Sequence, residues 1–276
     1  MRTAVITIAH GRHDHLAAQE AALRRSATTP DVRVVVAMDD ADLPGVVPAA
    51  DVVPVARVHG ALPLAAARNA GVRRARDLDA ELLVLLDVDC LPEPGMLGSY
   101  AAAADRVEGV LSGPVGYLPP APAGGYPTTG LRSLAPPHPA RPVPADGEVL
   151  TADDPDLFWS LSFALTGRTW DRIGGFCEDF YGYGGEDTDF GHAARRAGVP
   201  SWWVGGAWAF HQHHAANRPA DHLDDVLRNA GVFYDRWGWW PMRGWLDGFA
   251  ARGLARLDPA TDRWVRLSRA PTTARP

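Results

Sequence analysis

Residues 81–92 read Glu-Leu-Leu-Val-Leu-Leu-Asp-Val-Asp-Cys-Leu-Pro, and this stretch decides the fold class. Its apolar part, Glu81 to Leu86, is typical of a buried strand. The strand stops at two aspartates, Asp87 and Asp89, which are separated by a single residue. The stretch therefore predicts a buried strand whose end presents two carboxylates.

The chain before this strand repeats the same kind of pattern. Residues 3–9 and 32–38 are β-branched and apolar, and each predicts a strand. Pro63 suits the first turn of a helix that runs to about Asp77. Strands that alternate with helices indicate an α/β fold with a mixed, mostly parallel sheet flanked by helices.

Four aspartates follow predicted strands of this sheet: Asp39, Asp40, Asp87 and Asp89. In sheets of this class, ligands bind beyond the carboxyl ends of the strands. Two carboxylates two positions apart point to the same side and can share a divalent ion together with its phosphates. Acidic residues also follow buried strands without any metal, so this pair alone leaves both interpretations open.

Composition excludes several classes of protein. The chain has 276 residues and a formal charge of -6, which argues against a nucleic-acid partner. All 27 basic residues are arginines. Without lysine there is neither a phosphate-binding loop of the Walker A type nor a Schiff-base enzyme.

The cysteines and the apolar segments bear on the compartment. Two cysteines, Cys90 and Cys177, cannot form a disulfide framework or a cysteine-only zinc site. The apolar start is too brief for a signal peptide, and the later apolar run 202–210 is about half the roughly 20 residues of a membrane span. We therefore expect a soluble, cytoplasmic protein.

Residues 174–190 combine paired glycines with aromatic residues, and the second glycine pair leads into three carboxylates at positions 186, 187 and 189. Acidic side chains at the start of a helix are favoured by free amides and the helix dipole, which explains one or two of them. The bare glycines at 184–185 instead allow a ligand to approach the backbone before Glu186 and Asp187. The segment is thus a candidate ligand site as well as a helix start.

Histidines and one arginine complete the set of candidate residues. His211, His213 and His214 fall within four positions, and a neutral imidazole can complete an ion that Asp89 already holds. Arg68, on the helix before the aspartate pair, can reach a diphosphate. Packing histidines and a solvated surface arginine are the alternative interpretations.

Together these segments resemble the family 2 glycosyltransferases that carry a galactosyltransferase-type C-terminal segment. The resemblance runs from Val5 to about His214 and is anchored on residues 67–71, 85–92 and 174–189. Gly-Gly-Glu-Asp after aromatic-Gly-aromatic is similar to the signature of β-1,4-galactosyltransferases, chondroitin-type polymerases and polypeptide N-acetylgalactosaminyltransferases. The resemblance implies a GT-A fold of the nucleotide-diphospho-sugar transferase, Rossmann-like kind.

On the donor side, the resemblance implies a nucleotide-sugar donor, usually linked to UDP, and an Mn²⁺ or Mg²⁺ ion. Asp89 would bind the ion, with His211 as the distal ligand and His214 as its replacement. Asp87 would lie near the donor, where Arg68 assists. Asp39 matches the place where the family reads the base or the ribose.

On the acceptor side, the resemblance implies that Asp187 is the base of an inverting transfer and that Glu186 holds the acceptor. Tyr181 and Tyr183 can offer a ring face to a carbohydrate, glycolipid or glycoside, or they can pack in the core, and Gly185 is a further candidate for acceptor contact. The sugar transferred would be a hexose or an N-acetylhexosamine. Both tyrosines replace tryptophans of the animal galactosyltransferases, so the family's acceptor preference does not carry over.

We expect two parts in the chain. Residues 1–215 form the catalytic domain, in which the stretch 113–150 is a Pro/Gly-rich loop and a candidate lid, without regular secondary structure because ten prolines lie between Pro114 and Pro144. Residues 216–276 form a helical extension rich in tryptophan and arginine that packs on this domain, with about eight disordered residues at the end. A peripheral contact of the extension with the inner face of the membrane is the alternative.

Two other functions remain open. A sugar nucleotidyltransferase has a similar sheet, but its N-terminal loop is normally Gly-rich and contains lysine, whereas residues 9–14 here read Ala-His-Gly-Arg-His-Asp. A catalytically inactive carbohydrate-binding protein would keep the fold and the aromatic residues. Intact carboxylates at both motifs argue against such decay.

Overall fold

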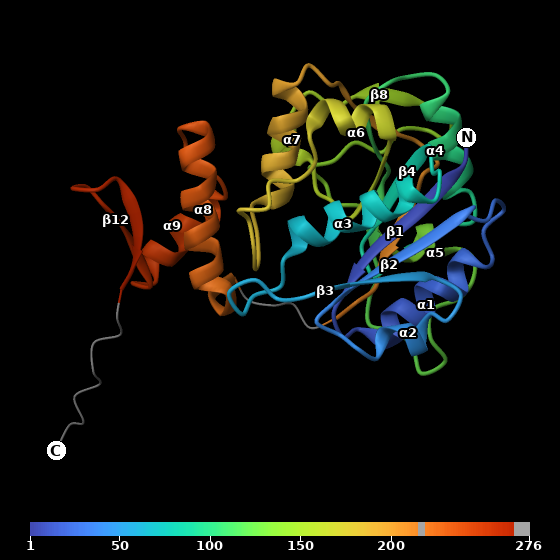
Figure 1. The fold of residues 1–276 in the computed structure, drawn as a ribbon, viewed down its shortest axis with the longest axis horizontal. Coiled ribbons are helices and arrows are strands. Elements are labelled where there is room, and N and C mark those ends of the chain that lie inside the picture. Colours follow the sequence, from blue (N-terminus) through green and yellow to red (C-terminus); the bar gives the residue numbers. More distant parts are fainter. Residues whose placement is uncertain (215–218, 268–276) are drawn as a thin grey trace.

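The structure, a computed structural model, describes residues 1–214 and 219–267 (Figure 1). A sheet of eight strands forms its centre and is covered by helices. The predicted disorder of about eight residues at the C-terminus concerns positions outside the described residues.

The central sheet is mixed. Its strands follow the order β3 (Asp51–Val55), β2 (Val32–Met38), β1 (Thr3–Ala9), β4 (Leu82–Leu86), β9 (Ser162–Thr166), β6 (Val110–Ser112), β10 (Ser201–Val204) and β8 (Val149–Thr151). The first four run parallel, β9 lies antiparallel between β4 and β6, and β10 pairs parallel with β6. The predicted class, a mixed and mostly parallel α/β sheet, is confirmed.

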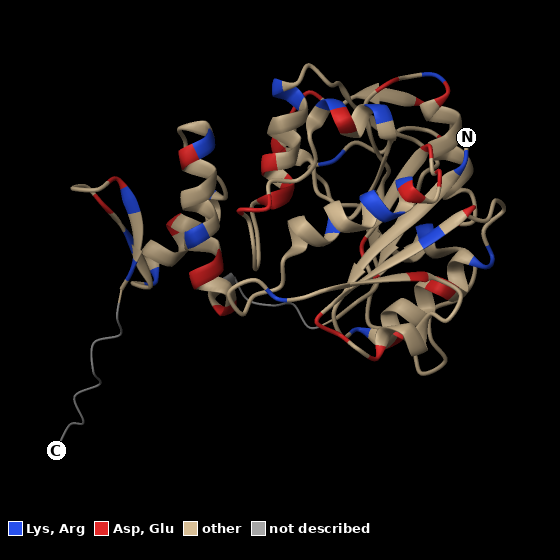
Figure 2. Cartoon of the chain, in the orientation of Figure 1, with Lys and Arg blue, Asp and Glu red and all other residues tan. Residues whose placement is uncertain are grey.

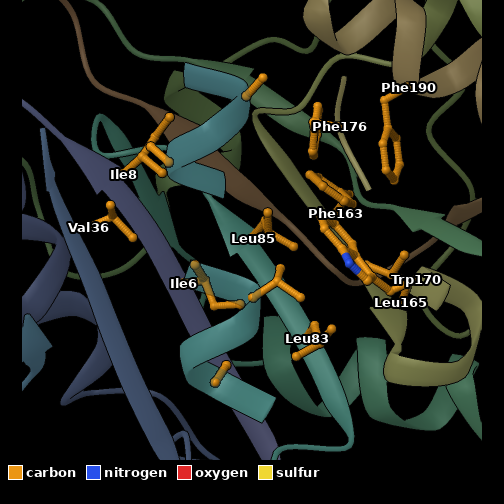
Figure 3. Packing of buried hydrophobic residues seen from close by; sticks show 14 of the residues in the cluster. Ile6, Ile8, Val36, Leu83, Leu85, Phe163, Leu165, Trp170, Phe176 and Phe190 are labelled. Carbon is orange, nitrogen blue, oxygen red and sulfur yellow. The ribbon is translucent and has the colours of Figure 1, made fainter. Parts of the chain in front are cut away.

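Helices cover both faces of this sheet. They are α1 (His13–Leu23), α2 (Leu43–Val46), α3 (Leu64–Asp77), α4 (Met96–Ala104), α6 (Gly167–Ile173) and α7 (Glu186–Arg196), with a 3₁₀ turn at Pro155–Leu157. On one face Ile6, Val36 and Leu85 pack in a cluster that also contains Phe163 and Phe190 (Figure 3). On the other face α4 packs its apolar side chains on β4 and β6.

The helix before the aspartate pair lies unusually close to the sheet. A side-chain carbon at Gly71 would come within 2.5 Å of the Ile6 side chain, so glycine is required where α3 crosses β1. Because of this close approach, α3 packs directly against the strands. One face of the helix, including Arg68 and Asn69, is therefore buried. Both side chains are therefore directed into the protein.

A second sheet joins three distant segments. Its order is β5 (Cys90–Pro92), β11 (Ala209–His211) and β7 (Val115–Tyr117). In the register of this sheet His211 lies opposite Cys90 and Tyr117. Backbone pairing thus brings the histidine cluster beside the second aspartate of the motif.

The Pro/Gly-rich stretch 113–150 is not wholly irregular, and that prediction was wrong in three places. It contains β7 and the short helix α5 (Leu131–Leu134), and its end enters β8. Residues 115–117 contain no proline, so their amides remain free to pair with a neighbouring strand. The stretch is also anchored, because Arg132 forms an ion pair with Glu93 outside it and a second ion pair with Asp146 in its own later part. Its role as a lid stays a prediction.

The chain after the second sheet continues as a 3₁₀ turn (Pro219–His222), α8 (Leu223–Trp237), α9 (Arg243–Ala251) and a hairpin of β12 (Ala255–Asp258) and β13 (Arg263–Arg266). We call residues 219–267 the C-terminal extension. It lies beside α7, away from the main sheet, with an apolar cluster of its own (Figure 1). The hairpin corrects the expectation of a wholly helical segment. Within the described residues, no helix has the length and apolar character needed to cross a membrane.

Candidate active site

The first half of the site gathers around Asp89, which follows β4. Its Oδ2 atom lies 3.6 Å from Nε2 of His211 and 3.3 Å from Nε2 of His214. One ligand atom from each of the three residues falls within 4.8 Å of the others. The second sheet brings these side chains together, because it pairs His211 with Cys90, the residue after Asp89.

These three side chains fit a divalent metal ion. One carboxylate and two imidazoles form a nitrogen and oxygen ligand set that first-row ions such as Mn²⁺ accept. Burial lowers the pKa of His211, which favours the neutral imidazole that a metal requires. The chemistry of the cluster therefore matches the metal that the family resemblance implies.

Sequence reasoning missed Arg12, which contributes a positive charge to this half of the site. Its Nη1 atom lies 3.3 Å from Oδ2 of Asp89. The residue precedes α1 in a left-handed conformation, with φ 52°, which is uncommon for a side chain larger than glycine. The available signal was its place just beyond the end of β1, on the edge of the sheet where ligands bind.

The second half of the site begins at α7. Figure 2 shows acidic residues gathered at the N-terminal end of this helix. Glu186 is buried, and the half-buried Asp187 accepts a hydrogen bond from the Thr188 amide at 2.8 Å. Burial, followed by the charge of the neighbouring Glu186, raises the pKa of Asp187 above the usual range. A carboxylate with a raised pKa is a stronger base near neutral pH.

Arg68 links the two halves. Its guanidinium donates to Oε1 of Glu186 at 3.0 Å and to Oδ1 of Asp87 at 3.3 Å. The arginine is only 4% exposed, so the alternative of a solvated surface residue is wrong. Burial raises the pKa of Asp87, although the charge of Arg68 opposes the shift. The Asp87 side chain remains 26% exposed. One buried cation thus joins the aspartate motif to the Glu-Asp motif.

Two cavities meet at this link. The first, of about 710 Å³, is lined by Arg12 and Asp89. The second, of about 500 Å³, is lined by Glu186 and Asp187. Four residues line both cavities: Leu64, Arg68, Asp87 and Tyr183. The geometry suits two ligands that react with each other across Asp87.

The predicted acceptor residues divide into two groups. Tyr183 and Gly185 line the second cavity. Tyr181 lines neither of the two cavities: the Arg228 guanidinium lies 3.8 Å from the centre of its ring, and the His59 ring packs beside it. The structure therefore separates the two tyrosines that the sequence grouped together.

Asp39 lies near the first cavity without lining it. Its Oδ2 atom accepts from Nε of Arg57 at 2.6 Å, and Arg57 itself lines the cavity next to His10. Asp39 adopts a left-handed conformation with φ 49°, which turns the chain at the end of β2. Its predicted contact with a base or a ribose would thus be made together with Arg57.

The third carboxylate of the Glu-Asp segment has a structural role. Asp189 is buried and accepts from Nε of Arg236 at 2.6 Å and from the indole nitrogen of Trp237 at 2.8 Å. Both partners end α8, so Asp189 joins the C-terminal extension to α7. The position of Asp189 near the start of α7 explains its presence less well than its hydrogen bonds to α8 do.

Comparison with known proteins adds independent observations. A protein-family model described as the N-terminal domain of galactosyltransferase matches residues 156–201, which include β9 and α7. Validoxylamine A glucosyltransferases of Streptomyces hygroscopicus subsp. jinggangensis (strain 5008) and subsp. limoneus are 32% and 31% identical over 193 residues, or 62% of this chain. The chain spans less than half of their length, 44% and 41%.

Among solved structures, the crystal structure of S. aureus TarS superimposes with a TM-score of 0.55 and 14% identity. The alignment covers 85% of this chain and 66% of that one. At this identity the likeness concerns the fold alone. The family match, the curated relatives and the shared fold together support a GT-A-like glycosyltransferase.

Proposed function

We propose that this chain is a metal-dependent, inverting glycosyltransferase. It moves a hexose or N-acetylhexosamine from a UDP-linked donor to the hydroxyl of a carbohydrate, glycolipid or glycoside. Glucose is the first sugar to test, because both curated relatives are named glucosyltransferases. The proposal rests on one observation above all: two cavities share Arg68 and Asp87, one lined by Asp89 of the candidate metal cluster and the other by Glu186 and Asp187.

The larger cavity is assigned to the donor. Asp89, His211 and His214 would hold Mn²⁺ or Mg²⁺, which neutralises charge on the departing nucleoside diphosphate. Arg12 lines the same cavity and adds a fixed positive charge for the phosphates. At the other end Arg57, paired with Asp39, is available for the base or the ribose.

The smaller cavity is assigned to the acceptor, with Asp187 as the base. The proton of the acceptor hydroxyl passes to Asp187 while the oxygen forms a bond to the anomeric carbon. The bond from that carbon to the diphosphate oxygen breaks, and the diphosphate leaves with the electron pair. Glu186, held by Arg68, accepts a hydrogen bond from the acceptor.

The proposed stereochemical outcome rests on the assignment of Asp187 as the base. With the donor in one cavity and the acceptor beside Asp187 in the adjoining one, direct attack of the acceptor oxygen from the side opposite the leaving group inverts the anomeric carbon. An α-linked donor then gives a β-linked product. The likeness to the galactosyltransferase segment supports the same outcome.

A donor panel tests the proposal against its alternatives. Purified protein is incubated with UDP-, GDP- and dTDP-linked sugars, with Mn²⁺, with Mg²⁺ or with EDTA, and nucleoside diphosphate release is measured. Metal-dependent release from one donor is the expected result. Pyrophosphate release from a nucleoside triphosphate with a sugar phosphate would favour a nucleotidyltransferase. No cleavage of any donor would favour an inactive binding protein.

A further inference from the structure

Apart from Leu64, Arg68 and Asp87, which also line the larger cavity, the smaller cavity is built from three separate parts of the chain. The Glu-Asp segment supplies residues 183–188, and the Pro/Gly-rich stretch and the turn after it supply Tyr117, His138 and Trp159. The third part is the C-terminal extension, which supplies Met242 and Trp245. The C-terminal extension, which was expected only to pack on the catalytic domain, thus forms part of the cavity wall.

The extension is tied to the catalytic helix by buried contacts. Asp189 on α7 is 1% exposed and accepts hydrogen bonds from Arg236 and Trp237 at the end of α8. The Arg196 guanidinium also packs on the Trp237 ring, 4.5 Å from its centre. A buried ion pair with a second hydrogen bond fixes one direction of approach, so α8 has a defined place against α7.

From that place α8 holds the glycine-rich loop at residues 181–185. Asn229 is fully buried and its side-chain amide donates to the carbonyl oxygens of Tyr181, Tyr183 and Gly184 at 2.8–3.3 Å. A side-chain carbon at Gly182 would come within 2.4 Å of the Asp225 carboxyl group. The loop and α8 are therefore fitted to each other.

The next helix completes the fit at the glycine pair. A side-chain carbon at Gly184 would lie 3.3 Å from the sulfur of Met242 and 3.6 Å from the Trp245 ring. The Trp245 ring stacks on Tyr183, with centroids 5.7 Å apart and planes 15° apart, and Tyr183 stacks in turn on His222. Much of the space beside the glycines is thus occupied by α9, and the half-buried Trp245 keeps a surface on the cavity.

We infer that Trp245 is an acceptor-binding residue and that its acceptor is a cyclic polyol, a sugar or a cyclitol ring, stacked against the indole face. This inference rests on the proposed glycosyl transfer and deepens it. The C–H bonds on one face of such a ring are apolar and slightly positive, which suits the negative face of an indole. The ring's hydroxyl groups then meet Glu186 and Asp187 in the same cavity.

The size and chemistry of the cavity agree with this class of acceptor. A volume of about 500 Å³ lies in the range of small-molecule sites. Aromatic side chains come from all three parts of its wall, namely Tyr117, Trp159, Tyr183 and Trp245. Carboxylates accept hydrogen bonds from hydroxyl groups and offer nothing to an apolar acceptor. An aromatic wall over paired carboxylates therefore selects rings with both C–H faces and hydroxyls.

Two substitutions at Trp245 test the inference. Trp245→Leu keeps apolar bulk but removes the ring face, and Trp245→Phe keeps a smaller ring face. The matched control is Trp239→Leu, because Trp239 belongs to the same extension, is 44% exposed and lines neither cavity. Thermal melting of each variant reports any general loss of folding.

The assay uses UDP-glucose and Mn²⁺ with methyl α- and β-D-glucopyranoside, myo-inositol and, as a linear comparison, sorbitol. For the ring acceptors we expect Trp245→Leu to lower kcat/KM about tenfold, mainly through KM, because one stacked ring is worth about that factor. Trp245→Phe should recover most of the loss, and Trp239→Leu should match the wild type. Donor hydrolysis without acceptor should be the same in all four proteins.

Three results would overturn the inference. One is an unchanged acceptor KM in a folded Trp245→Leu protein. Another is equal loss of donor hydrolysis and transfer, which would make Trp245 a structural residue only. The third is donor cleavage by the wild type with no transfer to any ring acceptor. If the wild type cleaves no nucleotide sugar at all, the proposed function fails first, and the inference fails with it.

Discussion

The two cavities of this protein differ in how their chemical groups are placed. The donor cavity lies at the carboxyl ends of β1, β2 and β4, so Arg12 and Asp89 are placed by the sheet itself, while the C-terminal extension adds His222, Asp225 and Arg228 to its wall. In the acceptor cavity, all residues other than the shared Leu64, Arg68 and Asp87 come from the proline-rich stretch and the turn after it, the glycine-rich loop with the start of α7, and the C-terminal extension. The difference teaches that the groups for metal and phosphate are placed by the sheet, whereas the groups for the acceptor depend on how later segments pack on it.

The largest expected effect comes from removing the base, which should stop transfer in the acceptor cavity and leave donor binding unchanged. Asp187→Asn keeps the shape and the N-terminal position on α7 but cannot accept the acceptor's proton. We expect kcat for transfer to fall by about 10³-fold, within the usual range for loss of a general base. Donor affinity, measured by isothermal titration calorimetry with Mn²⁺ present, should stay unchanged. Full transfer activity in this variant would remove Asp187 as the base.

Asp89→Ala should affect the metal site and leave the base in place. Loss of the carboxylate between His211 and His214 should weaken Mn²⁺ binding by at least about tenfold, as even outer contacts of a metal site contribute that much. Calorimetric titration with Mn²⁺ measures the change, and Asp187→Asn is the matched control with normal affinity. Equal Mn²⁺ affinity in Asp89→Ala and wild type would contradict the metal assignment.

The pH profile tests the environment of the acceptor cavity. Burial and the neighbouring Glu186 raise the pKa of Asp187 to about 7, and the base acts only when deprotonated. The rate of transfer should therefore rise with pH up to that region and fall about tenfold per unit below it. Initial rates between pH 5 and 9 give the profile. A profile that stays flat down to pH 5 would mean that the raised pKa is absent.

The smallest expected effect concerns the contact between α8 and the glycine-rich loop. Asn229→Ala removes one amide that serves three carbonyl oxygens, so we expect a loss of about 1–3 kcal/mol in the free energy of unfolding. Acceptor KM should rise a few-fold and by more than donor KM, because the held loop carries most of the acceptor wall but contributes Tyr183 to both cavities. Urea denaturation measures the first quantity.

The control for this change is Asp247→Asn, an exposed position on α9, which should stay within about 0.5 kcal/mol of the wild type. A rise in donor KM equal to the rise in acceptor KM would break the distinction between the two cavities. In that case α8 would support the whole site rather than the acceptor side.

The same distinction explains what could be predicted from the sequence. Three strands of the sheet, β1, β2 and β4, and the α/β class followed from local patterns, and Asp87 and Glu186 were named as site residues from a family signature. Arg12 was accessible by the same logic, since it follows β1 at the edge of the sheet where ligands bind. Residues at strand ends can be predicted from the sequence, because the pattern of apolar side chains and the turn residues that follow show where a strand ends.

The acceptor side was less accessible for a physical reason. Tyr181 and Tyr183 look alike in sequence, yet only the second lines the cavity, because Arg228 and His59 pack against the first. Trp245 is one of several tryptophans in the extension, and its local sequence does not distinguish it from Trp239. Only contacts between distant segments, such as Asp189 with Arg236, decide which ring reaches the cavity.

The most direct test of the central claim is an NMR time course of the reaction of UDP-α-D-glucose with Mn²⁺ and methyl β-D-glucopyranoside. It follows the anomeric protons of donor and product together with the release of UDP. Direct attack assisted by Asp187 predicts that the first product carries a new β-linkage and appears at the rate at which UDP is released. A new α-linkage as the first product would contradict direct attack assisted by Asp187.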